Sequence, residues 1–298
     1  MPGVNRQRLG EFLWWMCERQ RIWHRRHVEE QKPPWTTDEI LQEYHFCNIH
    51  RELDRGTQYY LDNIRDLNPP TDEDILLNTI FYRFFNRPET MRTIGWPIPK
   101  DKWSPSRVAE SLHVVAHSNP VFSSAYRVTT QAHADADNKI DNIVYGIFRD
   151  DILENWDYYT DAILDAPHLQ DAWGNLQEIP GVGDFLAYEI VTDLNYIVLP
   201  FSEDDFVNIG PGAEKGLDYI FDEVSEDNLR WLCDNQATLF EEFDLDYPYW
   251  EQKSHLTLRD WEHAACEFRK YVEIAEEGAE KRRFDVPDYN QDTFDDFL

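Results

Sequence analysis

The chain has 298 residues, of which 42% are hydrophobic and 14% aromatic, enough to bury the core of one large domain or two closely joined ones. Its formal net charge is −30, from 58 acidic and 28 basic residues. The sequence has no uninterrupted apolar run of about 18 residues and no signal-peptide pattern near its start, so we expect neither a membrane protein nor a secreted one, but a cytoplasmic one.

The acidic excess predicts a high-salt environment. So large a negative charge is costly through self-repulsion at low ionic strength. In molar salt the Debye length falls to about 3 Å and the repulsion is screened. We therefore expect a halophilic source, archaeal or one of its viruses, and action in the host cytoplasm. Because salt weakens phosphate contacts, DNA binding there would rely on local basic clusters, backbone donors and base-specific contacts.

The four cysteines are scattered along the chain and form no Cys-x-x-Cys pair: Cys17, Cys47, Cys233 and Cys266. This spacing indicates neither a disulfide framework nor a zinc or iron–sulfur site. We therefore expect four buried thiols and no metal held by them.

Helical patterns run along most of the chain and strand-like alternation is scarce, so the predicted fold class is all-α. Residues 1–36 are expected to form a basic N-terminal helix, residues 37–285 the main helical domain, and residues 286–298 an acidic tail. Within the main domain we expect helices inside residues 37–68, 74–86, 106–117, 139–165, 169–177, 213–222, 228–243 and 258–277. For the arginines of the first helix, a solvated face and a nucleic-acid contact both stay open.

Residues 176–190 predict a helix, a tight hairpin and a second helix. Gly181 and Gly183 adopt positive φ without steric cost, so the backbone can turn and point N–H groups toward an anion at the start of the second helix. We therefore expect Gly181, Val182 and Gly183 to bind the DNA backbone as a helix–hairpin–helix unit. An ordinary helical hairpin with a glycine turn is the alternative. No defined cofactor is indicated, and a monovalent or divalent cation at the hairpin is left open.

Two further segments mix arginines with apolar residues. If residues 46–59 are helical, Arg51 and Arg55 share a face and could clamp a phosphate, or they could form a salt-bridge ladder with acidic neighbours. Arg83 and Arg87 are also four residues apart, and would pair with structural carboxylates or with a substrate phosphate. The candidates for substrate and phosphate binding, with those of a later glycine-rich loop, are Asn48, Arg51, Asp54, Arg55, Thr57, Asn78, Arg83, Asn86, Arg87, Gly210 and Gly212.

Acidic residues at 203–205 follow the hairpin glycines by about twenty residues, the separation at which helix–hairpin–helix base-excision glycosylases place a catalytic aspartate. A plain surface charge run is the alternative. Residues 256–271 add two glutamates and a lysine, for which a helix surface ladder is the alternative. The candidate catalytic residues are therefore Asp205, Asp204, Glu267, Glu262 and Lys270.

With these segments in view, the chain resembles the helix–hairpin–helix glycosylase-like family of viral DNA base-hypermodification proteins. That family includes the α-glutamyl/putrescinyl thymine pyrophosphorylases and the helical domain of 5-hydroxymethyluracil DNA kinases. The resemblance is carried, in this order, by residues 48–57, 78–87, 179–183, 205–213 and 256–271. It implies a DNA glycosylase-like helical bundle and an enzyme that flips a modified thymine out of DNA.

The resemblance further implies a transferase that activates or substitutes the 5-methylene group of 5-hydroxymethyluracil, or of its pyrophosphorylated form, with amine transfer preferred. In this scheme the four arginines of the two segments hold the pyrophosphate. Asp205, Glu267 or Glu262 then acts on the incoming nucleophile.

Two departures from the family pattern restrict this hypothesis. Phe185 stands where bifunctional glycosylases place a Schiff-base lysine, so lyase chemistry is not expected. The sequence also lacks a Gly-x-x-x-x-Gly-Lys-Ser/Thr motif, so a phosphoryl-donor step would need a separate 5-hydroxymethyluracil DNA kinase. The expected partners are DNA, that kinase and a small amine or amino-acid co-substrate, without a membrane. A base-excision glycosylase and a non-catalytic DNA-binding module are the alternative functions.

Overall fold

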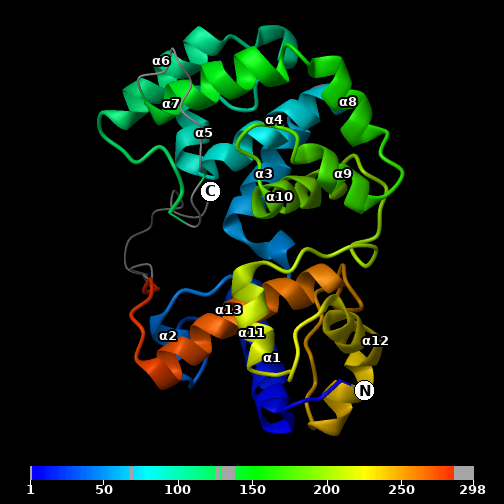
Figure 1. Ribbon diagram of the computed structural model, residues 1–298. Helices are drawn as coiled ribbons and strands as arrows, with labels where there is room; N and C mark the ends of the chain where they lie inside the picture. Colours follow the sequence, from blue (N-terminus) through cyan, green and yellow to red (C-terminus); the bar gives the residue numbers. More distant parts are fainter. Residues whose placement is uncertain (1, 68–69, 125–127, 129–137, 285–298) are drawn as a thin grey trace. The chain divides into compact units, whose positions relative to one another are not determined.

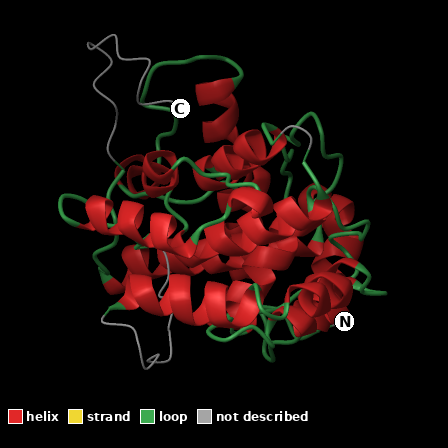
Figure 2. Ribbon diagram, turned by 90° about the horizontal axis from the view of Figure 1, so that it is seen from above, coloured by secondary structure: helices red, strands yellow, loops and turns green. Residues whose placement is uncertain are grey.

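A computed structural model of the chain describes residues 2–67, 70–124, 128 and 138–284. Among these residues every regular element is a helix, as Figure 2 shows, so the predicted all-α class is confirmed for this part of the chain. None of the helices found there is both long enough and apolar enough to span a bilayer. The predicted acidic tail at residues 286–298 lies outside the described residues.

Contacts group the described residues into two compact units. Unit 1 combines those between residues 2 and 54 with those between 209 and 284, and unit 2 is formed by those between 55 and 208. The first helix is thus an integral part of unit 1.

The helices of unit 1 come from both ends of the chain (Figure 1). They are α1 (Arg6–His27), α2 (Glu39–Glu43), the 3₁₀-helix η1 (Arg51–Leu53), α11 (Pro211–Asp218), α12 (Glu226–Glu242) and α13 (Leu258–Glu277). An aromatic core joins the first of these to the last: the ring of Phe268 lies 5.0 Å from that of Phe12 and 5.9 Å from that of Trp15. Aromatic rings at such distances add a specific attraction to the large apolar area that they bury.

The basic residues of α1 make contacts inside unit 1. Arg25 pairs with Glu18, Arg8 pairs with Glu11 and Glu276, and Arg19 donates to backbone carbonyls of residues 46 and 47. These contacts give the basic face a structural role inside unit 1, which neither the solvated face nor the nucleic-acid contact expected from the sequence describes.

Close packing of α11 on α13 explains two glycines of unit 1. A Cβ atom at Gly216 would lie 2.0 Å from the carbonyl oxygen of Ala265, and one at Gly212 would lie 2.5 Å from Sγ of Cys266. Both distances are far below van der Waals contact. Gly216 is therefore required for the approach of the two helices, because the atom in its way belongs to the backbone. At Gly212, which the sequence suggested for substrate binding, a Cβ atom would require the Cys266 side chain to shift.

Unit 2 contains the middle helices of the chain. They are α3 (Arg55–Arg65), α4 (Asp72–Phe85), α5 (Pro88–Ile94), the 3₁₀-helix η2 (Lys100–Lys102), α6 (Pro105–Ala116), α7 (Lys139–Asp141), the π-helix η3 (Asn142–Ile152), α8 (Trp156–Leu164), α9 (Leu169–Leu176) and α10 (Asp184–Asn195). Helix α4 is the central one: eleven of its residues are buried, including Phe81, whose ring lies 4.8 Å from that of Phe85 and 5.2 Å from that of Phe148.

Local side-chain bonds separate the two α-helices that form inside residues 37–68, α2 and α3. The Asn48 side chain donates to the Leu53 carbonyl at 2.7 Å, and the Asp54 carboxylate accepts the Asn48 backbone N–H at 2.8 Å. Such bonds offer the backbone an alternative to helical pairing. The chain therefore leaves α2 at Glu43 and stays extended or 3₁₀-helical until α3 begins at Arg55.

Candidate functional site

Half-buried polar side chains from three segments of unit 1 meet beside α13. We call this set the polar cluster, and it consists of Arg19, Cys47, Asn48, Asp54, His263, Glu267 and Lys270. Of the candidates from the sequence, it brings together Asn48 and Asp54 with Glu267 and Lys270, which lie more than two hundred residues further along the chain.

Asn48 organises one side of the polar cluster. Its backbone N–H and its side-chain amide both donate to Oδ1 of Asp54, at 2.8 and 3.1 Å. Its side-chain Oδ1 accepts a 2.7 Å hydrogen bond from Arg19, whose guanidinium also donates to the backbone carbonyls of Cys47 and Phe46. The orientation of the Asp54 carboxylate is thus fixed by two donors on a single oxygen.

Glu267 organises the other side. Its Oε2 accepts the backbone N–H of Cys47 at 2.8 Å, and its Oε1 lies 2.5 Å from Nζ of Lys270. Burial by itself would lower the pKa of Lys270, but the charge of Glu267, its hydrogen bond and the neighbouring Cys47 and Cys266 together outweigh burial, and the pKa is raised. Lys270 therefore carries its positive charge, and its side chain is 25% exposed.

His263 completes the polar cluster on α13. Its Nε2 lies 3.3 Å from Oδ2 of Asp54, the carboxylate oxygen that Asn48 leaves open. Burial alone would raise the pKa of Asp54, but its contacts with His263, the Asn48 N–H and the nearby Arg19 hold it below the usual value. Asp54 is therefore ionised near neutral pH and remains 21% exposed.

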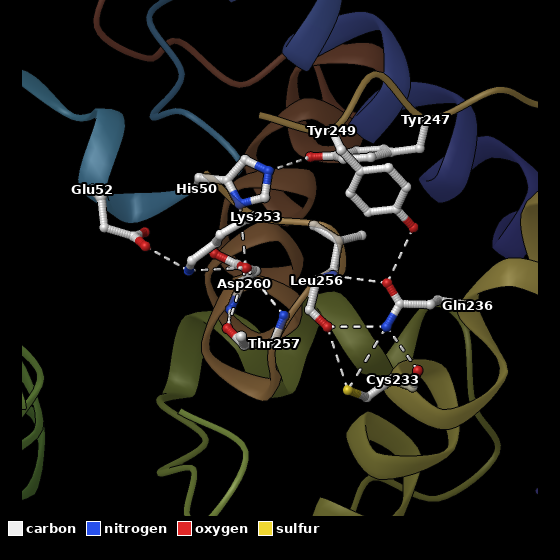
Figure 3. A network of polar contacts seen from close by, with 10 residues as sticks. All are labelled: His50, Glu52, Cys233, Gln236, Tyr247, Tyr249, Lys253, Leu256, Thr257 and Asp260. Atoms are coloured by element: carbon white, nitrogen blue, oxygen red, sulfur yellow. Dashed lines mark hydrogen bonds and ion pairs between the residues drawn. The ribbon is translucent and has the colours of Figure 1, made fainter. Parts of the chain in front are cut away.

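A second polar network, drawn in Figure 3, holds the segments that carry the cluster. Asp260 at the start of α13 caps that helix by accepting from Thr257, and it lies 3.3 Å from Nδ1 of His50 and 3.4 Å from Nζ of Lys253. Lys253 in turn lies 2.5 Å from Glu52. Burial would raise the pKa of Asp260, but the charge of Lys253 and the contact with His50 lower it instead. Because His50 and Glu52 belong to the segment that carries Cys47 and Asp54, this network ties that segment to α13.

Glu262 and Gly210, two further candidates in unit 1, contact each other at the start of α11. Glu262 is buried, pairs with Arg259 at 2.7 Å, and accepts the backbone N–H of Gly210 at 3.3 Å. Gly210 is the N-cap of α11, so the Glu262 carboxylate lies at the positive end of that helix. The geometry gives this pair a structural role, and their predicted part in substrate handling remains a prediction.

The expectation that Arg51 and Arg55 share a helix face is wrong. Arg51 lies in η1 and is 2% exposed, the backbone is extended at Asp54, and Arg55 begins α3 in unit 2 with a 65% exposed side chain paired to Glu89. Thr57, in the first turns of α3, is buried.

Arg83 and Arg87 are also not on one helix, because Asn86 adopts φ 47° and ends α4 before Arg87, which is the N-cap of α5. Arg83 is 4% exposed and donates from two nitrogens to Asp193, with further contacts to Glu189 and Asn86. The guanidinium N–H groups of Arg83 are thus already bonded to other side chains, which favours structural pairing over phosphate binding. Asn78 is likewise engaged, since its side chain pairs with both backbone groups of Ile98.

The predicted hairpin forms between α9 and α10. Gly181 adopts φ +83°, whereas Gly183 is the N-cap of α10 at φ −96°, so only the first glycine needs positive φ. Val182 is buried and its N–H donates to the Ile179 carbonyl at 3.0 Å, so the donors available to an anion lie further on, in the first turn of α10.

The acidic residues at 203–205 form a surface turn in unit 2. Asp205 is exposed, and its carboxylate accepts the backbone N–H of Ser202 at 3.2 Å, while the N–H of Asp204 donates to the Ser202 hydroxyl. Asp204 and Asp205 belong to a different unit from Glu267 and Lys270. The structure thus divides the predicted catalytic residues between two units.

Three members of the polar cluster were not among the candidates from the sequence: Arg19, Cys47 and His263. A signal for the last was present, because His263, Glu267 and Lys270 recur at the i, i+4, i+7 spacing of one helix face. Nothing in the sequence indicates that Arg19 or Cys47 lies beside that face.

Residues 6–281 match the family described as 5-hmdU DNA kinase, helical domain. The 5-hmdU DNA kinase of Bacillus phage SP10 is 32% identical to this chain over 292 residues, which cover 88% of this chain and 45% of the phage protein. The chain therefore spans about half the length of this relative. No solved structure matches, so the glycosylase-like architecture remains a prediction. The chain belongs to the family of 5-hmdU DNA kinase helical domains.

Proposed function

We propose that this chain is the DNA-engaging helical part of an enzyme system that modifies 5-hydroxymethyluracil in DNA, by phosphoryl transfer to the hydroxymethyl oxygen. The observation that carries the proposal is the family match over residues 6–281. The name of the phage relative supports phosphorylation as the chemistry.

The division of labour follows from what the sequence lacks. The chain covers 45% of the phage kinase, and its 298 residues contain no Gly-x-x-x-x-Gly-Lys-Ser/Thr phosphate-binding loop. We infer that the nucleotide-binding loop is supplied by another segment or by a separate kinase, and that the helical part binds and presents the base. Amine transfer, which the sequence favoured, remains a prediction that the relative's name does not support.

The polar cluster suits the presentation of a hydroxymethyl group. A hydroxyl both donates and accepts, and the cluster offers it the side-chain oxygens of Asp54 and Glu267 beside the donors of Arg19 and Lys270. Presentation requires the base to leave the duplex stack, because the half-buried side chains of the polar cluster cannot enter a stacked duplex to reach the 5-substituent. Base flipping is therefore part of the proposal.

Binding of matched DNA duplexes tests the recognition step. Fluorescence anisotropy would compare duplexes of one sequence that contain either thymine or 5-hydroxymethyluracil, at several KCl concentrations. We expect tighter binding of the modified duplex by about tenfold, the effect of one extra well-placed polar contact. Lys270→Ala should reduce this preference, whereas Lys32→Ala, an exposed lysine outside the cluster, should not. Equal affinity for both duplexes would contradict the proposal.

A reconstituted reaction tests the chemistry. The chain and the remaining half of a 5-hmdU DNA kinase would be incubated with modified DNA and ATP, and the nucleosides analysed by mass spectrometry. We expect a phosphorylated hydroxymethyl nucleoside only when both are present. Release of the free base would instead indicate the glycosylase alternative, and unchanged nucleosides despite DNA binding would indicate a binding module.

A further inference from the structure

We propose that Cys47, Asp54 and His263 form a zinc site within the polar cluster. One ligand atom of each residue, the thiol sulfur, a carboxylate oxygen and a ring nitrogen, lies within 4.8 Å of the other two. The proposal uses Asp54, to which the proposed function also gives a part, but its tests measure metal binding alone and do not depend on DNA.

The contact between His263 and Asp54 has the geometry of two ligands of one ion. Nε2 of His263 and Oδ2 of Asp54 are 3.3 Å apart, yet Nε2 is enclosed and no hydrogen bond of acceptable geometry is made to it. Tetrahedral zinc with bonds of about 2.0–2.2 Å sets its nitrogen and oxygen ligands about 3.4 Å apart. The two atoms therefore already stand at the separation of neighbouring zinc ligands.

Cys47 supplies the third ligand. A zinc–sulfur bond of about 2.3 Å places the sulfur about 3.6 Å from the other ligands, and the Cys47 sulfur lies within 4.8 Å of both of them. Binding therefore needs a shift of the thiol of no more than about 1 Å. The zinc–sulfur bond forms as the thiol proton leaves to solvent, so that the metal meets a thiolate.

Neighbouring groups hold the ligands as outer partners do in metal sites. The two donors of Asn48 occupy Oδ1 of Asp54 and leave Oδ2 directed toward His263. Glu267 fixes the backbone of Cys47 through its N–H. Such outer contacts orient ligands and raise metal affinity. The positive charges of Arg19 and Lys270 nearby oppose a dication, and the negative charges of Asp54, Glu267 and the new thiolate offset them.

The ligand set selects the metal. A thiolate and an imidazole favour zinc over magnesium and calcium, which prefer oxygen ligands. Three protein ligands leave one tetrahedral position for water or a substrate atom, as in catalytic zinc sites. No spacing motif in the sequence indicates this site, because its ligands come from two distant segments and include only one cysteine.

Cobalt spectroscopy tests the site, because thiolate-bound Co²⁺ gives a charge-transfer absorption that carboxylate-bound Co²⁺ lacks. We expect the metal-free chain to bind one Co²⁺ with this absorption, and Zn²⁺ to displace it. Cys47→Ser should abolish the absorption and weaken zinc binding by at least about 100-fold, and Asn48→Ala should weaken it by about 10–100-fold. Cys266→Ser removes a thiol of α13 that lies outside the proposed site. It should leave the charge-transfer absorption and the zinc affinity unchanged. Circular dichroism would check that each variant folds.

Alkylation of the unaltered chain provides a second measurement that needs no variant. Zinc should protect Cys47 from iodoacetamide and leave the reaction of Cys266 unchanged, as measured by mass spectrometry of peptides. Absence of stoichiometric metal, retention of the thiolate absorption in Cys47→Ser, or equal protection of both thiols would overturn the proposal and leave the contact between His263 and Asp54 as an ion pair.

Discussion

Glu267 of α13 accepts the backbone N–H of Cys47 at 2.8 Å, across a separation of 220 residues. The same carboxylate lies 2.5 Å from Lys270, so a single buried side chain links the N-terminal segment of unit 1 to its last helix. The geometry of the polar cluster depends on this link.

Glu267→Gln should destabilise unit 1 by about 1–2 kcal/mol. The amide still offers an oxygen to the Cys47 N–H, but the charge of Lys270, which is 75% covered, loses its partner. Denaturant unfolding would measure the change. Glu276→Gln removes the exposed partner of Arg8 instead and should alter stability by less than about 0.5 kcal/mol. Equal effects of the two substitutions would show that Glu267 has no special role.

Gly216→Ala should prevent α11 from packing on α13, at a cost of about 3 kcal/mol or more. The new methyl group would stand 2.0 Å from a backbone oxygen, which cannot move without shifting α13. Gly174→Ala is the matched control: it lies inside α9, and no atom comes within 4 Å of a Cβ placed there. We expect that control to be stabilising by about 0.5–1 kcal/mol in thermal unfolding. A harmless Gly216→Ala would contradict the close approach.

Glu273 should make the stability of unit 1 sensitive to acid. Burial would raise its pKa, but contacts with Lys215, Lys281 and Arg269 lower it to about 2. A carboxyl group with a depressed pKa stabilises the fold above its unfolded pKa of about 4.3, and this contribution disappears as the pH falls toward the folded value.

The pH dependence of Glu273→Gln would measure this contribution. The difference in unfolding free energy between the natural chain and the variant should be on the order of 1–3 kcal/mol at pH 6 and vanish near pH 2. A difference that stays constant over this range would show that packing rather than charge is responsible.

The sequence predicted the helices of this fold better than the positions of its side chains. Apolar spacing at 3.6 residues located α4, α12 and α13, although α4 is buried on all sides, at every residue from Ile75 to Phe85. Apolar spacing did not locate the non-helical segment between α2 and α3, where Asn48 and Asp54 bond to backbone groups in place of helical pairing. Such local competition does not alter the hydrophobic pattern, so periodicity does not reveal it.

The candidate site was only half predictable for a related reason. Spacing along one helix can place Glu267 near Lys270, but it cannot show that Asn48 and Asp54 approach them from the other end of the chain. The same limit applies to Arg83, whose partner Asp193 is 110 residues away. Its pairing was foreseen as an alternative because buried charges need partners, but the partner itself was not.

Salt should stabilise this protein if its net charge of −30 is an adaptation to a halophilic cytoplasm. Raising KCl from about 0.1 to about 2 M shortens the Debye length from about 10 Å to below about 3 Å and screens the self-repulsion. We expect Tm to rise by about 5 °C or more, equivalent to 1–2 kcal/mol. Sucrose at equal osmolality is the control, since it favours compact states without screening charge. An unchanged or lower Tm in KCl would contradict the halophilic interpretation.

Gly183→Ala separates the function of the hairpin from its folding. The residue is exposed at φ −96°, and no atom lies within 4 Å of a Cβ placed there, so the substitution should change the unfolding free energy by less than about 0.5 kcal/mol. If the first turn of α10 binds a DNA phosphate through its N–H groups, the added methyl group holds the phosphate away from them, and affinity for DNA should fall about tenfold.

Gly181→Ala is a poorer test, because φ +83° strains any other residue and confounds binding with stability. Anisotropy and denaturant unfolding of the same Gly183→Ala preparation would decide the matter: unchanged DNA affinity in a stable variant means that the hairpin only connects α9 to α10, whereas weaker binding without loss of stability assigns the contact to this turn.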